Sequence, residues 1–271
     1  MADPAQSAAS CSLAVAARRI TAGGAETREE IVAREEPIAL VYNGLSYAVM
    51  MASPADLEDF ALGFSLTEGL LTTADELYDV EVEALPTGFE LRLSVAAERF
   101  AALRARQRNL AGRTGCGLCG VDSIAEALRP IARVGGSACF AAEAVFRAMR
   151  ILPERQILNG EVGAVHAAGF ASAEGEILLV REDVGRHNAL DKLAGAIARA
   201  GIDAGAGFVV VSSRCSYEMV HKTAALGAPL IASVSAPTAL AIRFAEEAGV
   251  GLAAFAREGR FTLYANPDRI A

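Results

Sequence analysis

Two cysteines that stand two residues apart are the part of this chain best suited to chemistry. Cys116 and Cys119 lie among Gly115, Gly117 and Gly120 in the segment 113–122. Glycine tolerates backbone dihedral angles that other residues avoid, so this segment can form a loop that presents a thiol to another molecule. A Cys-x-x-Cys pair can be half of a zinc site, a redox dithiol, or a nucleophilic thiolate with a helper. The sequence therefore predicts sulfur or metal chemistry at this loop.

The cysteine count limits these alternatives. The chain has five cysteines and no second Cys-x-x-Cys, which excludes a zinc ribbon built from two such pairs in one chain. A mixed site that adds a histidine stays open, with His166, His187 and His221 as the available side chains.

Three polar segments that follow short apolar runs form a second candidate site. The apolar runs are 177–180, 208–211 and 230–234, and a helical pattern follows each polar segment. In an open α/β sheet, ligands bind beyond the carboxyl ends of the strands, and a helix N-terminus there favours anions through its free N–H groups and its dipole. We expect a polyphosphate or nucleotide-like ligand, with positive charge supplied by Arg181, Arg186, Arg214 and Lys222. Ordinary helix capping by Ser, Thr and Asp explains the same pattern equally well.

The sequence leaves more than one role possible for two side chains in these segments, His187 and Cys215. His187 stands near a predicted helix start, close to Asp183 and Arg186. It can be an acid/base group, a zinc ligand or a structural histidine that only makes hydrogen bonds. Cys215 follows Arg214 at the next helix start, where an exposed thiol would have a lowered pKa, but a buried small residue fits the position as well.

The C-terminal half alternates strands with helices. Its apolar runs are followed by helical patterns over 186–200, 215–226 and 238–248, and two further strands are predicted over 250–255 and 261–265. Continuous apolar strands between helices are typical of a mostly parallel sheet that is covered on both faces. The sequence therefore predicts an α/β fold for this half.

The N-terminal half predicts a smaller α+β domain. A hairpin is indicated over 37–50 across Asn43-Gly44, followed by a helix from Ser53 to about Gly69 and a second hairpin over 78–95. A basic helix, about 98–109, leads into the cysteine loop. We divide the chain into a disordered tail (1–25), an N-terminal α+β domain (26–110), the Cys-x-x-Cys loop with a short helix (111–140), and a C-terminal α/β domain (141–271).

Composition narrows the choice of partners and compartment. A net charge of −8 and a pI near 5.1 argue against nucleic-acid binding. The odd cysteine count suits a reducing compartment, and the N-terminus lacks the apolar run of a signal peptide. The uncharged stretch 223–242 is interrupted by Pro229 and Pro237, so we interpret it as buried core and not as a membrane span. We expect a cytoplasmic protein with neither a nucleic-acid nor a membrane partner.

Several motifs resemble one known family. The cysteine loop reads Arg113-Thr-Gly-Cys-Gly-Leu-Cys-Gly, and a longer block reads Arg181-Glu-Asp-Val-Gly-Arg-His-Asn-Ala-Leu-Asp-Lys. Shorter matches are Val165-His-Ala-Ala, Ser216-Tyr-Glu-Met-Val, Ser235-Ala-Pro-Thr and the ending that begins at Phe255. From about Glu36 to the C-terminus, the chain resembles the formate dehydrogenase accessory sulfurtransferases, the FdhD family.

The resemblance implies a function and a fold. Members of this family take sulfur as a persulfide from a cysteine desulfurase and deliver it to the molybdenum cofactor, bis(molybdopterin guanine dinucleotide), that formate dehydrogenase uses. It implies a homodimer, no intrinsic metal, and a C-terminal fold similar to cytidine deaminases without their zinc. The cofactor enters as bound substrate.

The resemblance also assigns residues. The persulfide falls on Cys116, with Cys119 as its companion. The family's cofactor-binding segment falls on Phe255, Ala256, Arg257, Glu258, Gly259 and Arg260. We add the residues at the predicted helix starts as further cofactor contacts: Arg181, Asp183, Arg186, His187, Ser213 and Arg214. The rival interpretation is a zinc-dependent, deaminase-like hydrolase that uses Cys116, Cys119 and His187.

Overall fold

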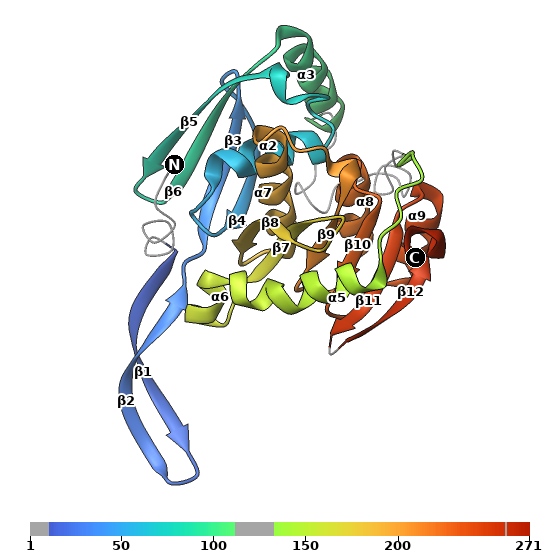
Figure 1. Cartoon of the computed structure of the whole chain (residues 1–271). Helices are drawn as coiled ribbons and strands as arrows, with labels where there is room; N and C mark the ends of the chain where they lie inside the picture. The colour runs from blue at the N-terminus through green and yellow to red at the C-terminus, as the bar shows by residue number, and fades with distance from the viewer. Residues whose placement is uncertain (1–10, 112–132, 258) are drawn as a thin grey trace.

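The computed structural model describes residues 11–111, 133–257 and 259–271. Both residues of the cysteine pair, Cys116 and Cys119, and also Glu258, lie outside this part of the chain. The described residues form a two-stranded ribbon, a four-stranded sheet and a six-stranded sheet (Figure 1).

The ribbon corrects the predicted disordered tail. Strands β1 (Ser12–Thr21) and β2 (Gly24–Ala33) pair antiparallel along their whole length and extend away from the rest of the chain (Figure 1). Disorder was therefore the wrong prediction for residues 12–25, whereas residues 1–10 are outside the described part. The backbone ladder is supported by ion pairs from Arg19 and Arg28 to Glu30, and buried Cys11 packs with Leu158 and Val165 at its base.

The four-stranded sheet confirms both predicted hairpins. Its strands are β3 (Glu36–Tyr42), β4 (Leu45–Ala52), β5 (Leu77–Leu85) and β6 (Gly88–Val95), in the order β4-β3-β6-β5. Asn43 and Gly44 form the first turn, both with positive φ (45° and 81°), as a tight turn between twisted strands requires. Alternate residues, among them Leu40, Tyr42 and Leu91, are buried on the face that packs against a helix.

That helix is α2 (Leu57–Thr67), which begins at Leu57 with Asp56 at its N-cap and not at Ser53 as predicted, and the basic helix is α3 (Ala97–Ala111). A short 3-10 turn, Ala74–Glu76, leads into β5. On α2, Phe60, Ala61 and Phe64 are buried in the same core as the sheet residues. The small sheet therefore has one face covered by α2.

The six-stranded sheet has the order β12-β11-β10-β9-β7-β8. Its strands are β7 (His166–Ser172), β8 (Ile177–Asp183), β9 (Gly207–Val211), β10 (Leu230–Ser233), β11 (Gly251–Arg257) and β12 (Arg260–Ala265). Strands β9, β10 and β11 run parallel, whereas β7 and β12 run antiparallel to their neighbours. The α/β class is confirmed, with a mixed sheet at its centre.

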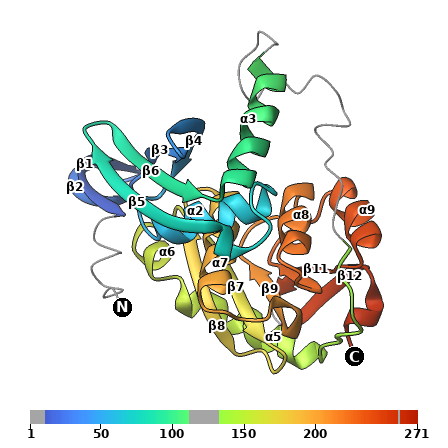
Figure 2. The ribbon, with the colours of Figure 1, turned by 90° about the horizontal axis from the view of Figure 1, so that it is seen from above.

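Helices cover both faces of this sheet. On one face, Val209, Val211 and Ile231 pack against α7 (Arg186–Arg199), α8 (Tyr217–Ala225) and α9 (Ala239–Ala248). On the other, Phe208 and Val210 pack against α5 (Ala142–Ile151). The remaining short elements are α6 (Ile157–Val162) and 3-10 turns at Leu152–Arg155, Ala204–Ala206 and Pro267–Arg269. Figure 2 shows α8 and α9 side by side.

Helices α2 and α7 join the two larger sheets into one layered body. They cross at Gly63 and Gly195, where a Cβ atom on Gly63 would overlap the carbonyl oxygen of Asp191. Buried polar contacts surround the crossing: Lys222 binds Asp191 and Glu68, and Lys192 binds Asp183. In the part of the chain that the structure describes, no helix combines the length and apolar character that crossing a membrane requires.

Candidate functional site

A polar pocket lies at the edge of the six-stranded sheet where β9 and β10 end. It has a volume of about 250 Å³ and its lining is rich in cationic and hydroxyl side chains: His166, Arg186, Ser212, Ser213, Arg214 and Ser235. Three of these, Arg186, Ser213 and Arg214, are among the predicted cofactor contacts. The position agrees with the rule that ligands of α/β sheets bind beyond the carboxyl ends of the strands.

Strand direction explains how distant segments meet here. Ser212 to Arg214 follow β9, Ser235 follows β10, and Arg186 opens α7 just after β8. His166 is the first residue of β7, and because β7 runs antiparallel to β9, its beginning lies at the edge where β9 ends. The antiparallel strand therefore adds a histidine to a site built otherwise from strand ends.

Backbone contacts hold the serine segments in place. The Ala167 N–H donates to Ser212 Oγ at 2.8 Å, and the Ser212 N–H donates back to the Ala167 carbonyl at 3.0 Å. Ser233 Oγ donates to the Ser235 carbonyl at 2.9 Å. The pocket floor is thus fixed by hydrogen bonds before a ligand binds, which lowers the cost of ordering it.

The pocket is electropositive. The Nε atom of Arg186 is buried and has no hydrogen-bond acceptor among the described residues. Burial lowers the pKa of His166, and the nearby guanidinium groups of Arg186 and Arg214 lower it further. A bound anion would relieve this repulsion, so the site is suited to a phosphate or a similar group.

The structure corrects three expected charges. Arg181 donates to Asp59 on α2 at 2.6 and 2.8 Å, and Lys222 is buried against Asp191. Asp183 is fully buried, pairs with Lys192 at 2.6 Å and accepts the Ser53 N–H at 2.9 Å. Arg181 pairs with Asp59 on α2, Lys222 pairs with Asp191 on α7 and Glu68 at the end of α2, and Asp183 pairs with Lys192 on α7. None of the three lines the pocket.

Asp183 still influences the pocket through the backbone. Its carboxylate accepts the Gly185 N–H at 2.8 Å and the Asn188 side-chain amide at 3.0 Å. Gly185 precedes Arg186 and Asn188 follows it in the first turn of α7, so the two contacts hold the backbone on both sides of Arg186. Asp183 is therefore a residue that positions Arg186.

His187 faces the neighbouring helix. Its Nε2 atom lies 2.8 Å from a Glu218 carboxylate oxygen and 3.5 Å from Ser216 Oγ at the start of α8. The hydrogen bond from His187 lowers the pKa of Glu218. This contact joins the first turns of α7 and α8, which favours the structural interpretation of His187.

The segment 255–260 reaches the same edge of the sheet. The Phe255 N–H donates to the carbonyl of Ser235, a lining residue, at 3.3 Å. Phe255 has a φ of 52°, an uncommon conformation for a bulky residue, and its side chain is 38% exposed. Ala256 is buried, whereas Arg257, Gly259 and Arg260 are exposed at the turn between β11 and β12. The structure thus brings Phe255 to the rim of the pocket.

Comparison with known proteins identifies the chain's family. The FdhD/NarQ family model matches residues 33–271. Proteins named sulfur carrier protein FdhD are similar to this chain: one from Cupriavidus necator is 55% identical, covering 88% of this chain and 83% of that protein. One from Bordetella petrii is 49% identical over 98% of this chain and 96% of that protein. The chain belongs to the FdhD/NarQ family.

A solved structure supports the same fold. A protein from Desulfotalea psychrophila, named as a candidate formate dehydrogenase accessory protein, is 26% identical and superposes with a TM-score of 0.74. The match covers 96% of this chain and 100% of that one. The architecture of sheets and helices described above is therefore that of an FdhD-like protein.

The cysteines within the described residues differ in exposure. Cys11 and Cys215 are buried, whereas Cys139 is exposed. Burial raises the pKa of Cys215 to about 12. Cys215 is therefore a buried packing residue and not an exposed thiol with a lowered pKa. The described residues contain no group of three or more His, Cys, Asp or Glu side chains that could hold a metal ion. The zinc alternative would need Cys116 and Cys119, which lie outside them.

We expect the burial of these thiols to control their reactivity. With the native protein at neutral pH, an alkylating reagent should label Cys139 within minutes and leave Cys11 and Cys215 unlabelled, because the thiolate is the reactive form and both buried sites exclude the reagent. Peptide mass mapping after a brief pulse measures the labelling of each site. Labelling of Cys215 as fast as Cys139 would contradict its buried position.

Proposed function

We propose that this protein is a sulfur carrier in the maturation of formate dehydrogenase. It receives persulfide sulfur on Cys116 from a cysteine desulfurase and passes it to the bis(molybdopterin guanine dinucleotide) cofactor. The observation that carries this proposal is the 55% identity to a protein named sulfur carrier protein FdhD, over most of both chains. The cysteine pair supplies the chemistry that such a role needs.

The loading step exchanges one S–S bond for another. The Cys116 thiolate attacks the outer sulfur of the donor's persulfide, the donor S–S bond breaks, and the donor cysteine leaves as a thiolate. The outer sulfur keeps its proton, so Cys116 becomes a persulfide with no net oxidation. In the release step, the Cys119 thiolate attacks the inner sulfur of that persulfide. A Cys116–Cys119 disulfide forms, and hydrosulfide leaves as the reduced product.

The pocket at the sheet edge suits the phosphates of this substrate. Two arginines, a histidine and three serines line it. Arginine binds phosphate through two parallel hydrogen bonds, which fixes the orientation of the ligand as well as its position. Phe255, whose backbone N–H donates to the carbonyl of the lining residue Ser235, is our candidate for a contact with a guanine base. The proposal keeps the homodimer implied by the family, which light scattering of the purified chain would measure.

Nucleotide binding tests the pocket. We expect guanosine diphosphate, as a fragment of the cofactor, to bind the wild-type protein, and Arg186→Ala and Arg214→Ala each to weaken binding about ten- to hundredfold. A charge-assisted hydrogen bond contributes roughly 1.5–3 kcal/mol, which sets this range. Calorimetric titration measures the dissociation constants.

The matched control is Arg243→Ala. Arg243 is exposed on α9, where it forms an ion pair with Glu247 one turn along the helix, and it does not line the pocket. This variant loses the same charge and should bind the nucleotide as the wild type does. If all three variants bind the nucleotide equally weakly, the loss of affinity is an effect of net charge and not of this pocket. If the Arg186 and Arg214 variants bind as tightly as the wild type, the phosphates bind at another site.

A further inference from the structure

The small sheet leaves its outer face open. On the inner face, buried residues such as Leu40 and Leu91 pack against α2. On the outer face, Val49 and Met51 of β4 are 61% and 49% exposed. Strand register places Ala39 beside Val49, so this half of the face is apolar. We call the face formed by the outward residues of β3 to β6 the outer face.

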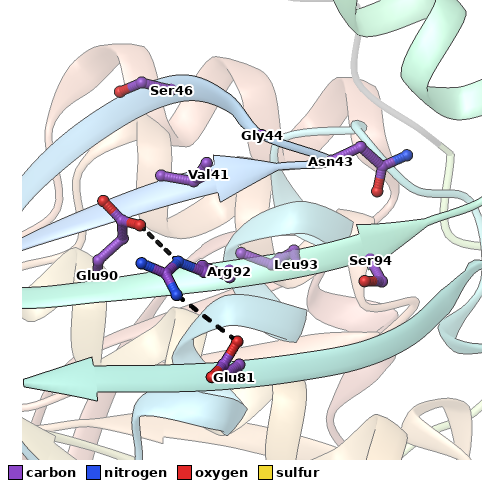
Figure 3. Close-up of a pocket in the computed structure, with 9 residues that line it drawn as sticks. All are labelled: Val41, Asn43, Gly44, Ser46, Glu81, Glu90, Arg92, Leu93 and Ser94. Carbon is purple, nitrogen blue, oxygen red and sulfur yellow. Dashed lines mark hydrogen bonds and ion pairs between the residues drawn. The ribbon is translucent and has the colours of Figure 1, made fainter.

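The other half of the outer face is acidic. Glu81, Glu83 and Glu90 surround Arg92, which lies 2.8 Å from Glu90, 3.8 Å from Glu81 and in contact with Glu83. Register adds Asp79, opposite Ser94. One guanidinium therefore serves several carboxylates, and the excess charge is negative. Figure 3 shows Glu81, Glu90 and Arg92 on neighbouring strands. Together with Val41 and Ser46 they line a hollow of about 470 Å³.

The combination of negative charge and apolar surface on the outer face determines which kind of partner can bind there. A phosphate-bearing ligand is repelled by the carboxylates, and a second copy of the same face would set like charges against each other. A partner segment that carries Lys or Arg beside apolar side chains is complementary to both halves. The hollow has room for side chains of that size.

The outer face is also connected to the cysteine segment. Strand β6, which carries Glu90 and Arg92, ends at Val95, and α3 begins at Ala97. Helix α3 has 15 residues, which corresponds to a length of about 22 Å, and it ends at Ala111, five positions before Cys116 in the sequence. The electropositive pocket belongs to the other sheet, so a protein on the outer face leaves that pocket accessible.

We propose that the outer face is the docking surface for the protein that donates sulfur, through a contact segment of that donor with basic and apolar side chains. This inference rests on the proposed function, because it names where the donor binds. It follows that exposed acidic residues of the face steer the encounter and that Val49 and Met51 stabilise the complex.

The test compares two sulfur sources. Wild-type protein is incubated with a purified cysteine desulfurase and cysteine, or with inorganic polysulfide, and mass spectrometry follows persulfide on Cys116. The variant E81K/E83K should load about tenfold more slowly from the desulfurase at low salt, with the difference shrinking as salt rises. Val49→Ser with Met51→Ser should also load slowly, with little salt dependence. Both should load from polysulfide at the wild-type rate.

The control E143K/E154K makes the same charge change at two exposed positions, one on α5 and one in the 3-10 turn that follows it, and should load normally. The proposal is wrong if both outer-face variants are loaded by the desulfurase at the wild-type rate. It is also wrong if they load slowly from polysulfide, because the substitutions would then impair the Cys116 thiol itself and not the docking of the donor. Loss of binding to apo formate dehydrogenase alone would assign the face to the client and overturn it too. A wild-type protein that takes up no sulfur from the desulfurase contradicts the proposed function itself.

Discussion

Cells whose only copy of this protein carries Cys116→Ala are expected to contain formate dehydrogenase polypeptide without activity. In the proposed function the Cys116 thiolate is the only atom that accepts the sulfur, and an alanine methyl group cannot replace it. The expected loss is to background, which makes this the largest functional effect of any single substitution considered. Formate oxidation in extracts, normalised to the amount of formate dehydrogenase, measures it.

Cys139→Ala is the matched control, because Cys139 is an exposed free thiol within the described residues. It should leave formate dehydrogenase fully active. Cys119→Ala separates the two steps, since it should still allow Cys116 to be loaded while slowing release of sulfur. Wild-type formate dehydrogenase activity in the Cys116→Ala strain would contradict the mechanism.

Gly63→Ala is expected to destabilise the fold severely. A Cβ atom at this position would overlap the Asp191 carbonyl oxygen and lie 2.6 Å from the Gly195 nitrogen. These are backbone atoms of α7, so no side-chain rotation can relieve the clash and the two helices must separate. The expected loss in the free energy of unfolding is about 3 kcal/mol or more, at the upper end for overpacked cores. Urea unfolding followed by circular dichroism measures it.

Separation of the helices would also disturb the charges between them. Lys222 and Asp191 are buried, as is the Arg181–Asp59 pair in part, and an unpaired buried charge is costly. Gly160→Ala provides the control: Gly160 lies within α6 with open space around its Cβ position. That change should be neutral or stabilise the protein by up to about 1 kcal/mol. A Gly63→Ala protein as stable as the wild type would show that the helices do not approach as closely as described.

Local signals predict much of this fold. The Asn43-Gly44 pair fixes the first hairpin, since both residues adopt positive φ easily. A helix follows Ser53-Pro54, but it begins at Leu57, because Ser53 contacts Val184 and Lys192 and does not cap it. The apolar runs before Arg186, Ser212 and Ser235 are strands, as their composition indicates. In each case the residues that decide the structure are neighbours in the sequence.

Strands β1, β2 and β7 depend on distant partners and were missed. The ribbon strand β1 has few buried side chains, so its sequence carries little amphipathic signal and its structure depends on pairing with β2. Strand β7 is a short apolar run after His166, similar to the other strands, but its antiparallel direction depends on its neighbours in the sheet. The prediction of a mostly parallel sheet came from the strands that are separated by helices.

For the candidate site, too, local sequence predicts some residues, and others depend on distant partners. The rule of strand ends predicts cofactor contacts at Arg186, Ser213 and Arg214, and all three line the pocket. His166 was missed as a lining residue because it enters from the start of an antiparallel strand. Arg181 was assigned to the ligand because sequence shows charge without its partner, and that partner is Asp59, more than a hundred residues away on α2.

Persulfide on Cys116 is the most direct test of the account. The purified protein is incubated with a cysteine desulfurase and cysteine, unreacted thiols are blocked, and peptides that contain Cys116 and Cys119 are analysed by mass spectrometry. The account predicts a mass gain of one sulfur on Cys116 that reducing agent removes and that is absent without the desulfurase. A peptide without added sulfur under conditions where the desulfurase turns over, or sulfur located on Cys139 instead, would contradict it.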